Sequence, residues 1–218
     1  MASTIATHEH LDGLEEYRHD SPGFSTSHPY LVPAVMLELA RLGGPKKVKR
    51  LFELGCGSGA VANVLATEGH AVTGVDPSTS GIALAKQHYP SLDLHTGSAY
   101  DDLRSKYGRF PVVISLEVVE HVFAPRKYAA TLFDLLEPGG TAIVSTPYHG
   151  YWKNLALAAS GQLDSHFSAL WDGGHIKFWS MKTLRTLLEE AGFTTIRYTF
   201  AGRCRPFSKS MLAIAYKR

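Results

Sequence analysis

The stretch that decides the fold is residues 51–59, LFELGCGSG. It begins with apolar residues, contains the acidic Glu53, and continues with glycines at every second position from residue 55 to residue 59. Because glycine accepts positive φ angles and has no Cβ, such a turn lets the backbone approach a ligand closely. Residues 60–66 then have the pattern of a helix. A strand, a glycine turn and a helix in this order predict the nucleotide-binding corner of a doubly wound α/β sheet.

Two kinds of nucleotide ligand fit this corner. Gly55 and Gly57, with Ala60 after them, satisfy the loose dinucleotide fingerprint of an NAD-type oxidoreductase. Glu53, however, lies two residues before Gly55. Its carboxylate there would repel a pyrophosphate and attract a ligand that carries an ammonium and a sulfonium. A turn with a purely structural purpose is the third interpretation, and the corner alone leaves all three open.

A second acidic residue supports a ribose. The β-branched run at residues 71–75 ends in Asp76-Pro77. Asp76 lies about 20 residues after the first glycine, the distance at which a carboxylate meets the ribose hydroxyls in nucleotide-binding sheets. A carboxylate suits a vicinal diol because it accepts two hydrogen bonds at once. Several classes of nucleotide-binding enzyme share this device, so Asp76 does not choose between them. The alternative role for Asp76 is an N-cap of the helix expected at residues 78–89.

Composition indicates an ordinary globular enzyme. The chain of 218 residues fits one domain, with 44% hydrophobic and 19% charged residues. No apolar run approaches the roughly 20 residues that span a bilayer, and the N-terminus lacks the features of a signal peptide. The two cysteines do not suggest a disulfide framework. We therefore expect a cytoplasmic protein, and the formal net charge of +2 gives no argument for a nucleic-acid partner.

The remaining pattern alternates between strands and helices, as a doubly wound sheet requires. Strands are expected at residues 48–54, 71–75, 92–95, 111–116 and 140–146, and helices at 58–67, 78–89, 101–107, 125–136 and 181–191, with a turn at 137–140. Two more strands, 193–200 and 210–216, are joined by a link too short for a helical crossover, which needs about a dozen residues. These two strands should pair antiparallel, which is not expected of a dinucleotide-binding domain.

Three motifs and this hairpin resemble the class I S-adenosylmethionine (SAM) dependent methyltransferases. The motifs are E-x-G-x-G-x-G at residues 53–59, PVVISLEVVEHV at 111–122 and LLEPGG at 135–140. The segments E-V-x-E-H from Glu117 and G-H-x-K-F from Gly174 are most similar to the ubiquinone-biosynthesis O-methyltransferase-like group. The resemblance covers most of the chain from about residue 48 onward. It implies a doubly wound, seven-stranded mixed sheet, the Rossmann-like methyltransferase fold, with an antiparallel C-terminal hairpin.

SAM is the cofactor that the resemblance implies, with Glu53 near the amino group of its methionine moiety. The expected cofactor contacts are Glu53, Gly55, Cys56, Gly57, Gly59, Asp76, Pro77, Ser98, Ala99, Leu116 and Glu117. The sequence departs from the family at two points. Pro111 replaces the usual acidic residue that opens the fourth strand, and Ser98 replaces the Asp that faces the adenine amino group in many members. A serine oxygen can still accept that hydrogen bond.

The function expected from these features is transfer of a methyl group from SAM to a small molecule, by O-methylation of a hydroxylated aromatic or quinol-like acceptor. The protein then has to align the acceptor with the sulfonium and remove a proton. A neutral histidine suits that task, and His121, His175 and His149 follow strands or lie in the insertion before the last helix. The alternatives are an N- or C-methyltransferase, an NAD(P)-binding oxidoreductase, and a non-catalytic SAM-binding protein. A structural role for each imidazole also stays open.

A metal site is a separate possibility. Glu117, Glu120 and His121 would share one helical face if their segment were helical, and together could hold a divalent cation. The ubiquinone-type resemblance implies a magnesium requirement. In the wider family, however, Glu117 lies beside the cofactor and Glu120 often serves local structure only. We therefore assign no metal ligand from the sequence.

The chain is expected to form a single methyltransferase domain over residues 1–218, built in four parts. Residues 1–47 form an N-terminal helical cap with a helix at 29–42, residues 48–146 the SAM-binding core, 147–179 a substrate or lid insertion, and 180–218 the C-terminal helix and hairpin. Within the insertion, Tyr148, Tyr151 and Trp152 are the expected substrate contacts, and a helix at 152–160 is a lid or an oligomer contact. The expected partner is a small-molecule methyl acceptor rather than a nucleic acid, and the protein is expected to be a monomer or a homodimer.

Overall fold

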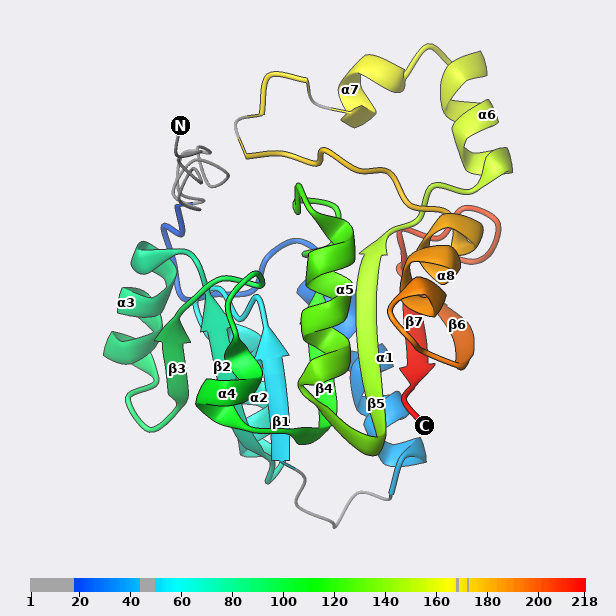
Figure 1. The fold of residues 1–218 in the computed structure, drawn as a ribbon. Helices are drawn as coiled ribbons and strands as arrows, with labels where there is room; N and C mark the ends of the chain where they lie inside the picture. The colour runs from blue at the N-terminus through cyan, green and yellow to red at the C-terminus, as the bar shows by residue number, and fades with distance from the viewer. Residues whose placement is uncertain (1–17, 44–49, 168, 172) are drawn as a thin grey trace, which may run out of the picture.

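The structure, a computed structural model, describes residues 18–43, 50–167, 169–171 and 173–218. Its described part contains a seven-stranded sheet with strand order β3-β2-β1-β4-β5-β7-β6 and helices on both faces (Figure 1). The strands are β1 (Arg50–Leu54), β2 (Ala71–Asp76), β3 (Asp93–Thr96), β4 (Phe110–Leu116), β5 (Leu136–Pro147), β6 (Thr195–Ala201) and β7 (Ser210–Tyr216). Strands β1 to β5 pair in parallel, and β7 pairs antiparallel with both β5 and β6. The expected mixed sheet with a C-terminal hairpin is confirmed.

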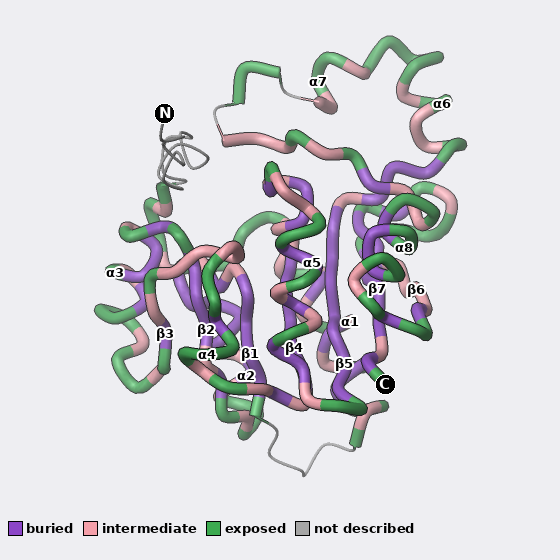
Figure 2. Tube along the Cα trace, viewed as in Figure 1, coloured by how far each residue is buried: buried purple, intermediate pink, exposed green. Residues whose placement is uncertain are grey.

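The helices cover the two faces of this sheet. They are α1 (His28–Arg41), α2 (Ala60–Thr67), α3 (Thr79–His88), α4 (Leu103–Tyr107), α5 (Pro125–Asp134), α6 (Tyr151–Ala159), α7 (Leu163–Phe167) and α8 (Met181–Glu190). Buried side chains of α1, α2 and α3 pack in one core cluster, and those of α4, α5 and α8 pack in the other. The central strands are largely buried (Figure 2), and most of their buried residues are apolar, as expected for strands that helices cover on both faces.

Local chemistry explains several helix boundaries. Helix α2 begins only after Gly59, because that residue has a left-handed φ of 80° and cannot belong to the helix. Helix α5 starts at Pro125, whose missing N–H costs nothing at a first helical position. At α8, the side chains of Ser180 and Thr183 form a capping box. These signals are short-range, which is why the sequence predicts the helices to within a few residues.

Two segments differ from expectation. Residues 137–140 were expected to form a turn, but they belong to β5, which begins at Leu136. Gly139 has a φ of 80° and donates its N–H to Lys217 O at 3.0 Å. The strand therefore continues through a local backbone irregularity that glycine can adopt. The short helix α7 was not expected at all. Residues 48–49 of the strand expected at 48–54, and residues 1–17 and 44–47 of the expected N-terminal cap, lie outside the described residues. The helix expected at 29–42 is α1.

The insertion lies at the end of the sheet where β4 and β5 terminate (Figure 1). It carries α6 and α7 and returns to α8 through an extended segment.

The helices among the described residues are all too short or too polar to span a lipid bilayer. An ion pair between the buried Glu38 of α1 and Arg197 of β6 links that helix to the edge strand of the sheet. In open α/β sheets, ligands bind outside the carboxyl ends of the strands. We therefore look for functional residues at the carboxyl ends of β1, β2, β4 and β5, where the insertion also lies.

Candidate functional site

The glycine loop, residues 55–59, follows β1 and favours glycine at three of its positions. Gly55, Gly57 and Gly59 have φ angles of 86°, 51° and 80°, which other residues rarely adopt. A Cβ at Gly55 would lie 2.3 Å from Cγ2 of Val118, closer than packed atoms approach. The Gly55 N–H also donates to Val75 O at 2.8 Å, which fixes the loop to the neighbouring strand. The loop thus lies at the carboxyl end of β1 and is held there by β2.

Asp76 connects this loop to the end of β2. Its Oδ2 accepts the N–H of Gly57 at 2.8 Å, and its Oδ1 accepts the N–H of Ser78 at 2.9 Å. Ser78 is the N-cap of α3, because its hydroxyl accepts the N–H of Gly81 at 3.1 Å. The alternative role of Asp76 as the cap of α3 is therefore filled by Ser78. Asp76 instead positions its carboxylate beside the glycine loop.

Glu53 is a buried carboxyl group on β1. Its side chain is only 2% exposed, and Oε2 has no hydrogen-bond partner. Burial, with a further contribution from the Asp76 carboxylate, raises the pKa of Glu53 to about 8. An unpartnered buried carboxyl group is unfavourable unless a ligand compensates it. An incoming cationic group would supply that compensation and favour the ionised form.

His19 is a neighbour of the loop to which the sequence assigned no role. A Cβ at Gly57 would lie 2.9 Å from Cε1 of His19, and one at Gly81 would lie 2.8 Å from its Cδ2. The His19 N–H also donates to Ser80 Oγ at 3.1 Å. The ring therefore covers the glycine loop and the first turn of α3. No local pattern reveals this contact, because it joins residues that are far apart in the chain.

The other expected cofactor contacts lie around the same strand ends. Cys56 and Leu116 are buried, Ala99 is half-buried, and Pro77 is exposed. The Ser98 hydroxyl accepts the N–H of Tyr100 at 3.1 Å, and its own N–H donates to Asp101 at 2.8 Å. Ser98 therefore already takes part in a tight turn after β3, and its hydroxyl retains a proton that it can donate.

Glu117, directly after β4, has an unusual backbone conformation. Its φ of 55° is the sole positive value at a non-glycine residue in the described part of the chain. Ser145 Oγ donates to Oε1 at 2.7 Å, and Ser210 Oγ donates to Oε2 at 3.2 Å. The Tyr30 hydroxyl lies 3.2 Å from Ser210 Oγ and extends this chain to α1. Burial, opposed by these hydrogen bonds, raises the pKa of Glu117 to about 7. Strained residues of this kind cluster at functional sites.

The helical face expected for Glu117, Glu120 and His121 does not form. Residues 119–121 make a single turn, and Glu117 stands apart in its left-handed conformation. The structure instead brings His175 of the insertion to Glu120 and His121, with one potential ligand atom of each within 4.8 Å of the others. Burial, followed by the Glu117 carboxylate, raises the pKa of Glu120 well above its usual value. These three side chains, and not Glu117, have the donor set that fits a divalent cation.

The imidazoles expected as bases have lowered pKa values. Burial first, and then His121, lower the pKa of His175 to about 4, and burial lowers that of His121. His149 is 8% exposed and packs 5.1 Å, between ring centroids, from Phe178. Burial, with Lys153 next, lowers its pKa to about 4. All three rings are therefore neutral at pH 7.

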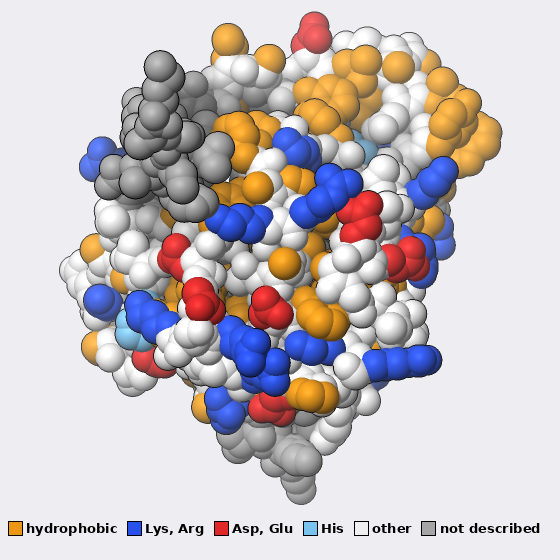
Figure 3. Space-filling view, in the orientation of Figure 1, with side chains coloured by type: hydrophobic (Ala, Val, Ile, Leu, Met, Phe, Trp, Pro, Cys, Tyr) orange, Lys and Arg blue, Asp and Glu red, His pale blue; other side chains and the backbone are white. Residues whose placement is uncertain are grey.

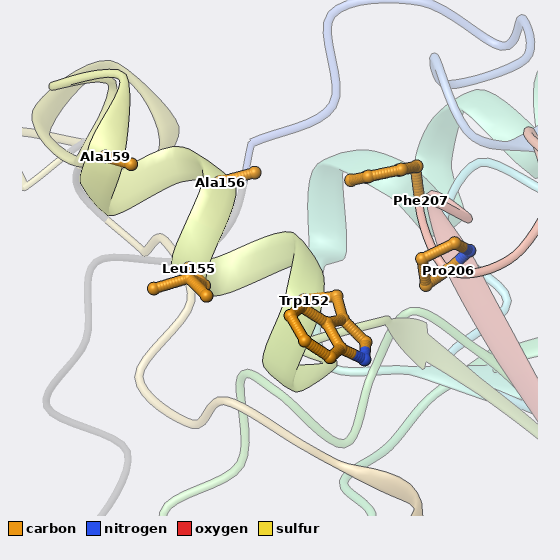
Figure 4. Close-up of a pocket in the computed structure, with 6 residues that line it drawn as sticks. All are labelled: Trp152, Leu155, Ala156, Ala159, Pro206 and Phe207. Carbon is orange, nitrogen blue, oxygen red and sulfur yellow. The ribbon is translucent and has the colours of Figure 1, made fainter.

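The three expected substrate contacts lie in different surroundings. Tyr148 is buried, with its ring 5.1 Å from that of Phe200, and belongs to the core. Tyr151 and Trp152, at the start of α6, are 74% and 62% exposed. Apolar side chains gather over the insertion on the face shown in Figure 3. An open apolar groove of about 430 Å³ separates α6 from the β6–β7 loop (Figure 4); it is lined by Trp152, Leu155, Ala156, Ala159, Pro206 and Phe207.

The strand order, the antiparallel β7 and the glycine loop with its two carboxylates define a methyltransferase-type α/β protein. Residues 30–198 match the family model described as a methyltransferase domain, and the chain belongs to this family. The fold is also similar to that of magnesium protoporphyrin IX methyltransferase from Synechocystis, solved with bound S-adenosylhomocysteine. That likeness has a TM-score of 0.66 and 20% identity, and covers 86% of this chain and 82% of the other.

Curated relatives include ubiquinone biosynthesis O-methyltransferases of two bacteria. The Caulobacter sp. (strain K31) protein is 40% identical over 116 residues, which are 51% of this chain and 46% of that protein. The Bradyrhizobium sp. (strain ORS 278) protein is 38% identical over 117 residues, 51% and 45% of the two chains. The chain thus matches these curated relatives over about half of their length.

Proposed function

We propose that this protein transfers a methyl group from SAM to a hydroxyl group of a small hydroxylated aromatic or quinol-like acceptor. The observation that carries the proposal is the buried Glu53 carboxyl, whose Oε2 lacks a partner beside a left-handed glycine loop. The ammonium of SAM would stabilise the ionised form of this carboxyl group, whereas a dinucleotide pyrophosphate would bring no positive charge to compensate it. Membership of the methyltransferase family supports the same choice.

The proposed cofactor site extends from Glu53 along the strand ends. The Asp76 carboxylate, held by Gly57 and Ser78, accepts the ribose hydroxyls. The backbone of Gly55, Gly57 and Gly59, with Cys56 between them, lies along the methionine and ribose moieties, and Pro77 flanks the ribose. Ser98 and Ala99 contact the adenine, and Leu116 and Glu117 close the site from β4. His19 joins this set because it covers Gly57 and Gly81.

The acceptor is proposed to bind between these strand ends and the insertion. The exposed Tyr151 and Trp152 are available for contact with an aromatic ring, whereas the burial of Tyr148 favours a packing role. The names of the curated relatives support a phenolic or quinol-like acceptor. A neutral imidazole of His121, His175 or His149 is proposed to accept a hydrogen bond from the acceptor hydroxyl and to receive its proton.

Transfer of a labelled methyl group tests the proposal. Purified protein is incubated with methyl-labelled SAM and one acceptor at a time: a catechol, a hydroquinone, a monophenol, an aliphatic amine or a carboxylic acid. The proposal predicts labelled aryl ethers, identified by mass spectrometry, and no labelled amines or esters. Labelled N- or C-methyl products would assign the chain to another class of methyltransferase. Label retained wholly in SAM, with no SAM binding, would contradict the proposal altogether.

A further inference from the structure

An irregular segment, residues 18–23, lies beside the glycine loop and α3, and we call it the strap. It forms neither helix nor strand. His19 and Pro22 are half-buried, whereas the other four residues are exposed. Figure 1 shows the strap, in blue, at the end of the sheet where β1 and β2 terminate, with the chain continuing from it towards α1. The two half-buried residues therefore face the rest of the protein.

His19 makes the first contact of the strap. Its ring packs on two positions that have no side chain, since a Cβ at Gly57 or at Gly81 would lie within 2.9 Å of it. The His19 N–H also donates to Ser80 Oγ at 3.1 Å, in the first turn of α3. Glycine at both positions thus leaves room for the imidazole to lie directly on the backbone of the loop.

Pro22 makes the second contact, with Tyr89 at the C-terminal end of α3. The Tyr89 hydroxyl donates to Pro22 O at 3.2 Å. The Tyr89 ring also packs on the glycine loop, because a Cβ at Gly59 would lie 3.3 Å from its Cδ2. The two hydrogen bonds therefore hold the strap to both ends of α3.

The carboxyl groups proposed to bind the cofactor are covered in this closed arrangement. Glu53 is 2% exposed and Asp76 is 9% exposed. Gly57, on which the His19 ring lies, donates its N–H to Asp76 Oδ2 at 2.8 Å. A ligand as large as SAM can therefore reach Asp76 only after a neighbouring element has moved.

The strap is the neighbouring element that can move most easily. The glycine loop is fixed to β2, because the N–H groups of Gly55 and Cys56 both donate to Val75 O. Helix α3 is a regular helix with a capped N-terminus. The strap, by contrast, is largely exposed and irregular. Segments with few buried contacts and exposed hydrogen bonds open at the lowest free-energy cost.

We propose that the strap is a gate over the cofactor site, and that SAM enters and leaves when the strap opens. The gate rests on the proposed function for the identity of its ligand. Opening breaks the hydrogen bonds to Ser80 and Tyr89 and lifts the His19 ring from Gly57. Closing restores these contacts over the bound cofactor and shields it from water, as lids do in other enzymes.

Two conservative substitutions remove the hydrogen bonds of the strap. Tyr89→Phe removes the hydroxyl that bonds to Pro22 O and keeps the ring on Gly59. Ser80→Ala removes the oxygen that accepts the His19 N–H. Tyr198→Phe is the matched control, because its hydroxyl donates to Met181 O at 2.9 Å on β6, at the opposite edge of the sheet from β3. Circular dichroism verifies the fold of each variant.

Surface plasmon resonance with SAM measures the gate. The same hydrogen bonds hold the strap with and without SAM, so weakening them should raise the association and dissociation rates together. We expect about 5-fold for each single variant and about 25-fold for the double variant. The dissociation constant should change by less than about 3-fold, because a gate alters both rates equally. Tyr198→Phe should leave both rates unchanged.

Hydrogen exchange of the His19 amide, followed by NMR, gives a second readout that needs no SAM. Tyr89→Phe leaves the bond from His19 to Ser80 in place and removes only the bond at Pro22. If the strap opens as a unit, this variant should exchange the His19 amide about 5-fold faster than the wild type. An unchanged exchange rate in the folded variant would overturn the gate.

The binding kinetics give two further contrary results. Unchanged rates in the double variant would overturn the gate alone, provided that the wild type binds SAM. A higher dissociation constant with an unchanged association rate would also overturn it, because the strap would then belong to the binding surface and would not control entry. Absence of SAM binding by the wild type would contradict the proposed function and the gate together.

Discussion

The Gly57 N–H donates a 2.8 Å hydrogen bond to Asp76 Oδ2, so the glycine loop and the end of β2 are joined directly. One carboxylate therefore fixes the loop and also faces the position proposed for the ribose. A carboxylate suits this position because it has two acceptor oxygens, whereas a neutral amide side chain has only one. The Gly57 N–H engages Oδ2 of this carboxylate, and the Ser78 N–H engages Oδ1.

We expect Asp76→Asn to weaken SAM binding by about 10- to 100-fold. The amide has one acceptor oxygen where the carboxylate has two, and its hydrogen bonds to the ribose lose their ionic character. Calorimetry with SAM measures the effect. Asp93→Asn, which changes a carboxylate at the start of β3 that bonds to Thr73 and His95, is the matched control. Equal affinities of wild type and Asp76→Asn would remove Asp76 from the ribose site.

Glu53→Gln should stabilise the ligand-free protein and weaken its affinity for SAM. Because the folded pKa of about 8 lies above the unfolded value of 4.5, the folded state retains a proton that the unfolded state loses. The stability of the wild type therefore falls as pH rises from about 4.5 to about 8, and the glutamine lacks this dependence. We expect urea unfolding to give the variant an advantage on the order of 1–3 kcal/mol at pH 8 and little at pH 4.5.

The affinity of Glu53→Gln for SAM should fall by about 10- to 100-fold, since a charge-assisted hydrogen bond to the ammonium is lost. S-adenosylhomocysteine retains that ammonium and should lose affinity by a similar factor. A variant that is less stable at every pH and binds SAM normally would contradict the role given to this carboxyl group.

The backbone strain at Glu117 can be measured with two substitutions. Glu117→Gly and Glu117→Ala both remove the carboxylate bonded to Ser145 and Ser210, but glycine adopts a φ of 55° without strain. We expect the glycine variant to be more stable than the alanine variant by about 1 kcal/mol in urea unfolding. Equal stabilities would show that the left-handed conformation is not a property of the folded protein in solution.

The ion pair between Glu38 and Arg197 should stabilise the attachment of α1 to β6. Arg197→Ala leaves Glu38 buried without this partner, and we expect a loss of about 1–3 kcal/mol, because the arginine is partly exposed. Arg126→Ala, which breaks the exposed pair with Glu190, is the control and should destabilise the protein much less than Arg197→Ala.

The same ion pair predicts a pH dependence. The hydrogen bond from Arg197 holds the pKa of Glu38 below its usual value. The pair therefore contributes fully above the unfolded pKa of 4.5 and loses its contribution as the pH falls through the folded pKa. The difference in unfolding free energy between wild type and Glu38→Gln should shrink below about pH 4.5.

The sheet could be predicted from the sequence because its signals are local. Continuous apolar runs mark the buried strands, and glycines at positive φ mark the loop after β1. The short link between β6 and β7 dictates their antiparallel pairing. Residues 137–140 were mistaken for a turn because glycine and proline also mark bulges, and the sequence alone does not distinguish the two.

The candidate site could be predicted only in part, because its chemistry depends on long-range contacts. Helical spacing grouped Glu117 with Glu120 and His121, but the left-handed conformation of Glu117 separates them. His175 reaches Glu120 only because its segment hydrogen-bonds to Glu120 O. His19 covers Gly57 from outside the core for a similar reason. No periodicity or motif encodes such meetings of distant segments.

Calorimetry on purified protein stripped of copurified ligand tests the central claim most directly. SAM, S-adenosylhomocysteine and NADH are titrated in turn into the wild type and into Glu53→Gln. We predict one SAM or S-adenosylhomocysteine site per chain, weakened in the variant, and no binding of NADH. Binding of NADH in place of SAM, or the absence of any SAM site, would contradict the account.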